Sequence, residues 1–145
     1  MDPSVRITYH AREKKSSQYG FMLMSKTSTV SYTQRITVQN AKSIPLEALK
    51  IIDNIPVSQD DSIQVKLISP ALSQPGQPSS RKSISTGSGV CAQWHGVGDE
   101  QALESTIGKD GKLNWVLNIP PMKTVHLALQ FEVTSPHDVT VQGLN

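Results

Sequence analysis

Apolar and polar residues alternate along much of this chain with a repeat of two, which is typical of half-buried β-strands. Residues 30–39 have one polar residue, Gln34, on a face that otherwise consists of Val30, Tyr32, Ile36 and Val38. Residues 127–133 repeat the pattern with leucine, phenylalanine and valine at every second position. The alternation and the turn signals together predict strands at 3–9, 30–39, 46–55, 62–69, 89–95, 102–107, 112–119, 124–134 and 138–142.

Turn residues separate the predicted strands. Asp110-Gly111 is the clearest hairpin signal, because this pair supplies the positive φ angles of a type I′ turn or a bulged loop. Residues 40–43 predict a second turn. Residues 45–52 have helix-favouring side chains, but the segment is too short to be stable as a helix and residues 51–55 suit a strand. We interpret it as a strand.

Short strands at regular spacing predict an all-β protein, and we expect an immunoglobulin- or fibronectin-like antiparallel β-sandwich. Trp94 and Trp115 are the natural anchors of its core. Residues 73–89 are rich in Ser, Gly and Pro and predict a long mobile loop inside the domain. Because neither half of the chain would have a full core, we expect one domain over residues 1–145.

Composition excludes several classes of protein. Of the 145 residues, 37% are hydrophobic, and no apolar run approaches the roughly 18 residues of a membrane span. Asp2 and Pro3 follow Met1 without a hydrophobic stretch, so no secretory signal is visible. The single cysteine, Cys91, excludes an internal disulfide framework and fits a reducing compartment. We therefore expect a cytoplasmic protein.

The net charge of +2 is unevenly distributed. Residues 1–50 carry eight basic and three acidic side chains, whereas the remainder carries six and nine. The densest basic stretch predicts an anion contact, for a phosphate or an anionic lipid, formed by Arg6, Arg12, Lys14 and Lys15. The alternative is a solvated strand end and loop. Only Tyr9 and Tyr19 are nearby for base stacking, so we expect no nucleic-acid binding.

An apolar patch follows the basic stretch and is unusual for a plain sandwich. It is either an edge element packed on the core or an exposed contact surface, for which flexible methionine side chains are suited. We treat it as a candidate interaction patch of Tyr19, Phe21, Met22, Leu23 and Met24.

The possible catalytic and metal-binding groups do not match known spacings. Cys91 and His95 would lie on one face of a strand roughly 13 Å apart, too far for the imidazole to activate the thiol, and the alternative is a buried, inert cysteine. The acidic residues fit no calcium loop, and no His or Cys spacing suits zinc; the acidic groups are Asp53 with Asp60-Asp61, and Asp99-Glu100. We expect Asp60 and Asp61 to accept hydrogen bonds from turn N–H groups. The sequence predicts no catalytic residue, metal or cofactor.

Several segments together resemble the C-terminal domain of mucoidy-inhibitor-A-like proteins. The most specific is Asp53-Asn-Ile-Pro-Val-Ser58, and the others are 5–10, 32–38, 62–66, 111–115, the proline pair 120–121 and 129–133. The resemblance implies a module of unknown function, here excised or independently expressed, whose family offers no established catalytic residues. The long insertion at 73–89 suggests a fungal member.

These observations favour a non-enzymatic β-sandwich module that mediates protein–protein interaction or self-association within a larger architecture. The alternative is a ligand-binding module for carbohydrate or anionic lipid, in contact with Trp94, Trp115 or the N-terminal basic stretch. The exposure of Trp94 distinguishes them, because a solvent-facing ring favours a ligand platform and a buried ring favours core packing.

Overall fold

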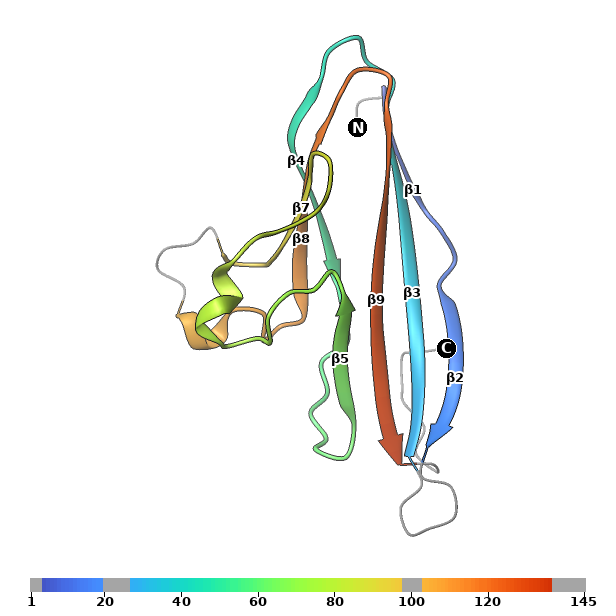
Figure 1. The fold of residues 1–145 in the computed structure, drawn as a ribbon, viewed down its shortest axis with the longest axis vertical. Helices are drawn as coiled ribbons and strands as arrows, with labels where there is room; N and C mark the ends of the chain where they lie inside the picture. The colour runs from blue at the N-terminus through green and yellow to red at the C-terminus, as the bar shows by residue number, and fades with distance from the viewer. Residues whose placement is uncertain (1–3, 20–26, 98–102, 137–145) are drawn as a thin grey trace.

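Two antiparallel β-sheets pack face to face in the computed structural model, which describes residues 4–19, 27–97 and 103–136 (Figure 1). Sheet A consists of β1 (Val5–Tyr9), β2 (Glu13–Tyr19), β3 (Thr27–Asn40), β5 (Gln64–Ser69) and β9 (Thr124–Pro136). Sheet B consists of β4 (Leu46–Asn54), β6 (Ile84–Gly87), β7 (Val90–Trp94) and β8 (Lys112–Ile119). The predicted all-β class and antiparallel β-sandwich are confirmed.

Sheet A is built around β3, in the order β1–β3–β9–β5. β3 pairs with β9 from Thr27 opposite Pro136 to Gln39 opposite Thr124. On its other side, β1 pairs with residues 36–40 and β2 with residues 27–33. The alternation in the sequence is confirmed, because the following side chains of β3 and β9 are buried in the core: Tyr32, Ile36, Val38, Leu127, Leu129, Phe131 and Val133.

Sheet B has the order β4–β8–β7–β6, and β8 supplies four buried side chains to the core, those of Leu113, Trp115, Leu117 and Ile119. Trp94 on β7 is 1% exposed and Trp115 is 2% exposed. The indole N–H of Trp94 donates a hydrogen bond of 2.8 Å to the carbonyl of Ser73. Both tryptophans are therefore core anchors, as the sequence predicts.

Asn40 links the two sheets at the end where β3 leaves sheet A. The β3–β4 and β8–β9 connections meet at this end, at the top of Figure 1. The Asn40 side chain is fully buried, and its Nδ2 lies 3.0 to 3.2 Å from the carbonyl oxygens of Ile44, Ile119 and Pro120. Its Oδ1 accepts a hydrogen bond of 2.9 Å from the backbone N–H of Lys42. We call this arrangement the Asn40 clamp.

Residues 46–54 form a strand, as we interpreted them, despite their helix-favouring composition. A β-bulge between Leu46 and Leu49 shifts the pairing with β8, and Ala48 within it has a positive φ of 52°. Asn118 of β8 accepts a hydrogen bond of 2.9 Å from the backbone N–H of Ala48. This side-chain contact holds the bulge against the neighbouring strand.

Two strands are not predicted by the pattern. β2 reads Glu-Lys-Lys-Ser-Ser-Gln-Tyr and has no apolar alternation, because backbone pairing with β3 holds it at the sheet edge. β6 and the 3-10 helix η1 (Pro78–Arg81) both lie inside 73–89, which the composition predicts as a loop. Ile84 pairs with Ala92, and Ser80 is buried with its hydroxyl donating to the carbonyl of Gln77, so local pairing overrides the polar composition.

The strand predicted at 102–107 is wrong, because residues 104–106 form a 3-10 helix, η2 (Glu104–Thr106). The Thr106 hydroxyl donates a hydrogen bond of 2.7 Å to the carbonyl of Leu103 and favours the turn. The Asp-Gly pair therefore ends an irregular segment and joins no hairpin, and Gly111 has a positive φ of 73°. The strand predicted at 138–142 lies outside the described residues.

Candidate functional site

A groove of about 600 Å³ opens beside β5 (Gln64–Ser69). Its lining comes from four separate segments, 55–58, 63–67, 72–75 and 108–109 with Gly111, together with Trp94. Most of these side chains are apolar or half-buried, and the Trp94 ring belongs to the core. We call this hollow the β5 groove.

One wall of the β5 groove is β5 itself, which pairs only with β9 among the described strands. Val65 and Leu67 pair with the buried Val133 and Phe131 of β9, and both are half-buried against the core. Lys66 lies on the opposite face of the strand and is exposed. The strand therefore presents an open backbone edge beside apolar side chains.

The opposite wall depends on two glycines with positive φ angles, Gly108 (φ 81°) and Gly111 (φ 73°). A Cβ atom at Gly108 would lie 2.8 Å from Cδ2 of the Trp94 ring. A Cβ atom at Gly111 would collide with the carbonyl oxygen of Ile55. The turn reaches the core this closely only because both residues lack a side chain.

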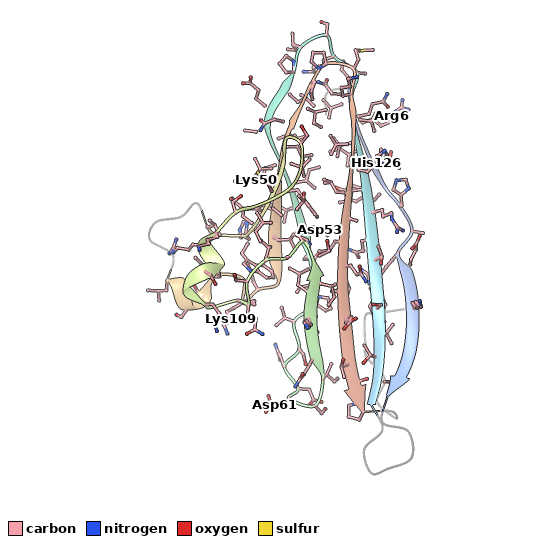
Figure 2. All side chains as sticks on the ribbon, in the orientation of Figure 1. Arg6, Lys50, Asp53, Asp61, Lys109 and His126 are labelled. Atoms are coloured by element: carbon pink, nitrogen blue, oxygen red, sulfur yellow. The ribbon has the colours of Figure 1, made fainter. Side chains whose placement is uncertain are left out.

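Among the described residues, the lining of the β5 groove contains two cations, Lys66 and Lys109, and no carboxylate. Figure 2 shows Lys109 on the side of β5 away from β9. Both lysines are exposed, and Glu132 of β9 is the cross-strand neighbour of Lys66 on the outer face of sheet A. The groove therefore favours an occupant that carries negative charge next to apolar groups.

A chain of polar contacts links the two sheets, from the exposed Arg12 to the half-buried Gln34 and Asp53. Arg12, between β1 and β2, donates a hydrogen bond of 2.6 Å from Nε to Gln34 Oε1 on β3. Gln34 Nε2 donates one of 3.3 Å to Asp53 Oδ1 on β4. The Arg12 guanidinium also lies over the stacked rings of Tyr32 and Phe131, 5.8 and 5.9 Å from their centroids. We call these contacts the Arg12–Asp53 bridge.

Asp53 is the ionisable end of this bridge and lies between the two sheets (Figure 2). Burial raises the pKa of Asp53, while the backbone N–H of Asn54, the Trp115 indole and the Arg12 charge oppose the increase. Asp53 Oδ2 and Trp115 Nε1 are buried, and neither makes a hydrogen bond of good geometry with another described group. The carboxylate is thus incompletely paired at its core-facing oxygen.

The predicted anion-contact residues do not gather on one surface. Arg6 is opposite Gln39 on the outer face of sheet A, whereas Arg12 turns inward over the aromatic rings. Lys14 and Lys15 are exposed neighbours on β2 and point to opposite faces of the sheet. Of the four, only Arg12 is a member of the Arg12–Asp53 bridge.

The predicted interaction patch falls almost entirely outside the described residues. Tyr19 is the last residue of β2, and only its backbone is described. The other members of the patch, Phe21, Met22, Leu23 and Met24, lie in residues 20–26, outside the described ranges. Their role as a contact surface stays a prediction.

Cys91 and His95 lie on the outer side of sheet B, since Val90, Ala92 and Trp94, which alternate with them along the chain, point into the core. Cys91 is half-buried and not fully buried, and the His95 ring nitrogen Nδ1 lies 3.4 Å from Asn114 Oδ1. The histidine therefore contacts an amide on β8.

Asp60 holds a turn, as predicted. Its Oδ1 accepts hydrogen bonds from the backbone N–H and the hydroxyl of Ser62, at 2.9 and 2.8 Å, and these bonds lower the pKa of Asp60. Asp61 is exposed in the same loop, far from Asp53 between the sheets (Figure 2). Across residues 4–19, 27–97 and 103–136, no three His, Cys, Asp or Glu side chains converge as metal ligands.

A second hollow of about 520 Å³ lies beside the bulge of β4, lined by residues 45–48 and 118–121. Glu47 is the only ionisable residue in its lining. β4 is also an edge strand among the described strands, but a bulge interrupts its pairing here and the hollow has no buried aromatic floor, so the β5 groove is the stronger candidate site.

Sequence reasoning missed the β5 groove, because its walls come from segments that are far apart along the chain. Leu72 is buried in it, although the residue directly precedes the stretch read as a loop. The Arg12–Asp53 bridge did leave a signal, since Gln34 is the one polar residue on an apolar face. Such a misplaced polar residue indicates a partner across the core.

Comparison with known proteins places the chain in a family. No curated protein and no solved structure shows a significant match to it. No described helix is long and apolar enough to span a membrane. The model of one family, described as "Domain of unknown function (DUF4139)", matches residues 1–137, and the chain therefore belongs to this family.

Proposed function

We propose that this chain is a non-enzymatic β-sandwich module that mediates protein–protein contact, with another protein or with a second copy, as part of a larger architecture. One observation carries the proposal, the open edge of β5 beside the β5 groove. Unpaired backbone groups at a strand edge and adjoining apolar side chains are a surface to which another chain can add.

Photo-crosslinking from three exposed positions tests this function. A photoreactive amino acid replaces Lys66 on β5, Ile52 on the outer face of sheet B, or His126 on the outer face of sheet A, one at a time. We expect a discrete protein adduct from position 66, and mass spectrometry identifies it as a second copy or another protein. Absence of a discrete adduct from all three positions would contradict the proposed function.

No observation on the described residues favours the alternative of a carbohydrate or anionic-lipid module. Trp94 and Trp115 are almost fully buried, so neither presents a ring face for sugar stacking. The four N-terminal cations Arg6, Arg12, Lys14 and Lys15 are divided between two faces of sheet A.

We also propose a narrower placement, among mucoidy-inhibitor-A-like proteins of fungal origin with a cytoplasmic location. The segment Asp53–Ser58 and the insertion at 73–89 support the placement, and the single cysteine supports the compartment. Sequencing of the source genome around this gene and microscopy of the tagged full-length protein test both points.

A further inference from the structure

The β5 edge limits what can bind beside it. β5 has six residues, its pairing with β9 shifts between Leu67 and Ser69, and Pro70 follows. Short length, an irregular register and proline all restrict strand pairing. Only a short extended segment can therefore add here, and its side chains must supply much of the affinity.

The alternation of β5 specifies the side chains of such a segment. Val65 and Leu67 face the core side, so the residues opposite them in an added strand would face the apolar lining of the β5 groove. The residue opposite Lys66 would lie on the outer face, beside its ammonium group. Opposite charges across a strand pair stabilise it, and like charges destabilise it. The segment that fits is apolar on one face and acidic on the other.

Lys109, on the opposite wall of the β5 groove, also favours an acidic segment. It is exposed and lines the β5 groove, and the described part of the lining contains no acidic side chain. A second copy of the chain is a poorer occupant, because its β5 would place a lysine opposite Lys66 when the two strands pair about this residue. The second β5 would also bring its own sheet against the wall at 72–75 and 108–109.

We propose that the β5 groove binds an extended segment of another protein, with alternating apolar and acidic residues, that adds to sheet A as a strand beside β5. The inference rests on the proposed function and specifies its partner. Val65 and Leu67 supply the apolar contacts, the β5 edge supplies backbone hydrogen bonds, and Lys66 and Lys109 select for carboxylates.

Two synthetic peptides test the proposal with the full chain. One is the capped peptide Thr-Val-Glu-Val-Glu-Val-Thr, and the other has lysine in place of both glutamates. Residue-resolved amide hydrogen exchange by NMR measures protection along β5 during each titration. We expect the glutamate peptide to protect β5 amides and to bind at least about fivefold more tightly than the lysine peptide.

Charge reversal provides the matched variants. Lys66→Glu should invert the preference between the two peptides, and Lys109→Glu should reduce it. Lys50→Glu changes an exposed lysine on the outer face of sheet B and should leave the preference unchanged. All three sites are exposed, and a dispersed amide spectrum verifies folding of each variant.

Three results would overturn the proposal: no added protection on β5, equal binding of the two peptides, or protection in the free chain of those β5 amides that point away from β9, which would show an edge occupied from within. The proposed function is tested separately by the crosslinking experiment. An adduct from position 52 or 126 would support protein–protein contact but at a site other than β5, whereas the absence of any adduct would contradict the proposed function.

Discussion

Gln34 and Asp53 lie on opposite sheets, and the Gln34 side-chain amide donates a hydrogen bond of 3.3 Å to Asp53 Oδ1 across the interior. A directional bond between sheets adds geometric specificity that apolar packing alone lacks. The same bond places a carboxylate where desolvation disfavours its charge. The Arg12–Asp53 bridge is therefore an organising contact whose effect on stability depends on pH.

The pH dependence of unfolding should differ between the wild type and Asp53→Asn. Because burial raises the pKa of folded Asp53 above the ordinary 3.8, its contribution to stability is present at low pH and is lost as pH rises through the folded pKa. The free energy of unfolding of Asp53→Asn minus that of the wild type should thus increase as pH rises above about 4. Urea unfolding between pH 3 and pH 7 measures the difference.

Asp60→Asn is the control with the opposite sign. Hydrogen bonds from Ser62 lower the pKa of Asp60, so its ionised form stabilises the fold above 3.8 and this contribution is lost on acidification. The free energy of unfolding of Asp60→Asn minus that of the wild type should decrease as pH rises. An increase of this difference with pH for both variants, or no change with pH for Asp53→Asn, would contradict the directions assigned to the pKa values of Asp53 and Asp60.

Arg12→Ala should lower the free energy of unfolding by about 1 kcal/mol, since it removes the hydrogen bond to Gln34 and the cation over Tyr32 and Phe131. Arg12→Lys should recover only part of this, because an ammonium group lacks the planar guanidinium. Lys15→Ala, at an exposed position on β2, should change stability by less than about 0.5 kcal/mol. Chemical denaturation that ranks Lys15→Ala with Arg12→Ala would refute the bridge as a stabilising contact.

Much of the sandwich is predictable from the sequence, because β3 and β9 carry apolar residues at alternate positions, with Gln34 as the exception in the core-facing part of β3, and bury mainly one face. β2 is not predictable in this way, since it is a polar edge strand that exists through backbone pairing with β3. The β5 groove cannot be predicted from the sequence pattern either, because Val65, Leu72 and Trp94 meet only after the chain has folded.

Gly111→Ala should destabilise the protein by more than about 2 kcal/mol, because the residue has a positive φ and its new Cβ would collide with the Ile55 carbonyl. Gly96→Ala, with a positive φ of 93° but open space around it, should cost about 1 kcal/mol. Gly87→Ala meets nothing within 4 Å and should be neutral or slightly stabilising. Thermal unfolding of the three variants gives the order, and equal effects would show that close approach at Gly111 is unimportant.

Asn40→Asp should destabilise the protein by about 3 kcal/mol or more, because it directs a buried carboxylate at the carbonyl oxygens of Ile44, Ile119 and Pro120. Asn118→Asp is the matched control, since this exposed residue only accepts a bond from Ala48 and aspartate can accept it equally. Its effect should stay below about 0.5 kcal/mol. Similar losses for both variants in urea unfolding would argue against the Asn40 clamp.

The Asn40 clamp also determines how the two layers can move. Apolar contacts have no preferred direction, so two sheets held by them alone could slide past one another with little change in buried area. Hydrogen bonds from one side chain of sheet A to carbonyls at the end of β8 lose their geometry after a displacement of about 1 Å. The Arg12–Asp53 bridge repeats the constraint further along the sandwich. Because the Asn40 clamp and the Arg12–Asp53 bridge connect the sheets at two positions along the sandwich, the sheets resist sliding past one another. A force that a partner applies to one sheet is therefore transmitted to the other.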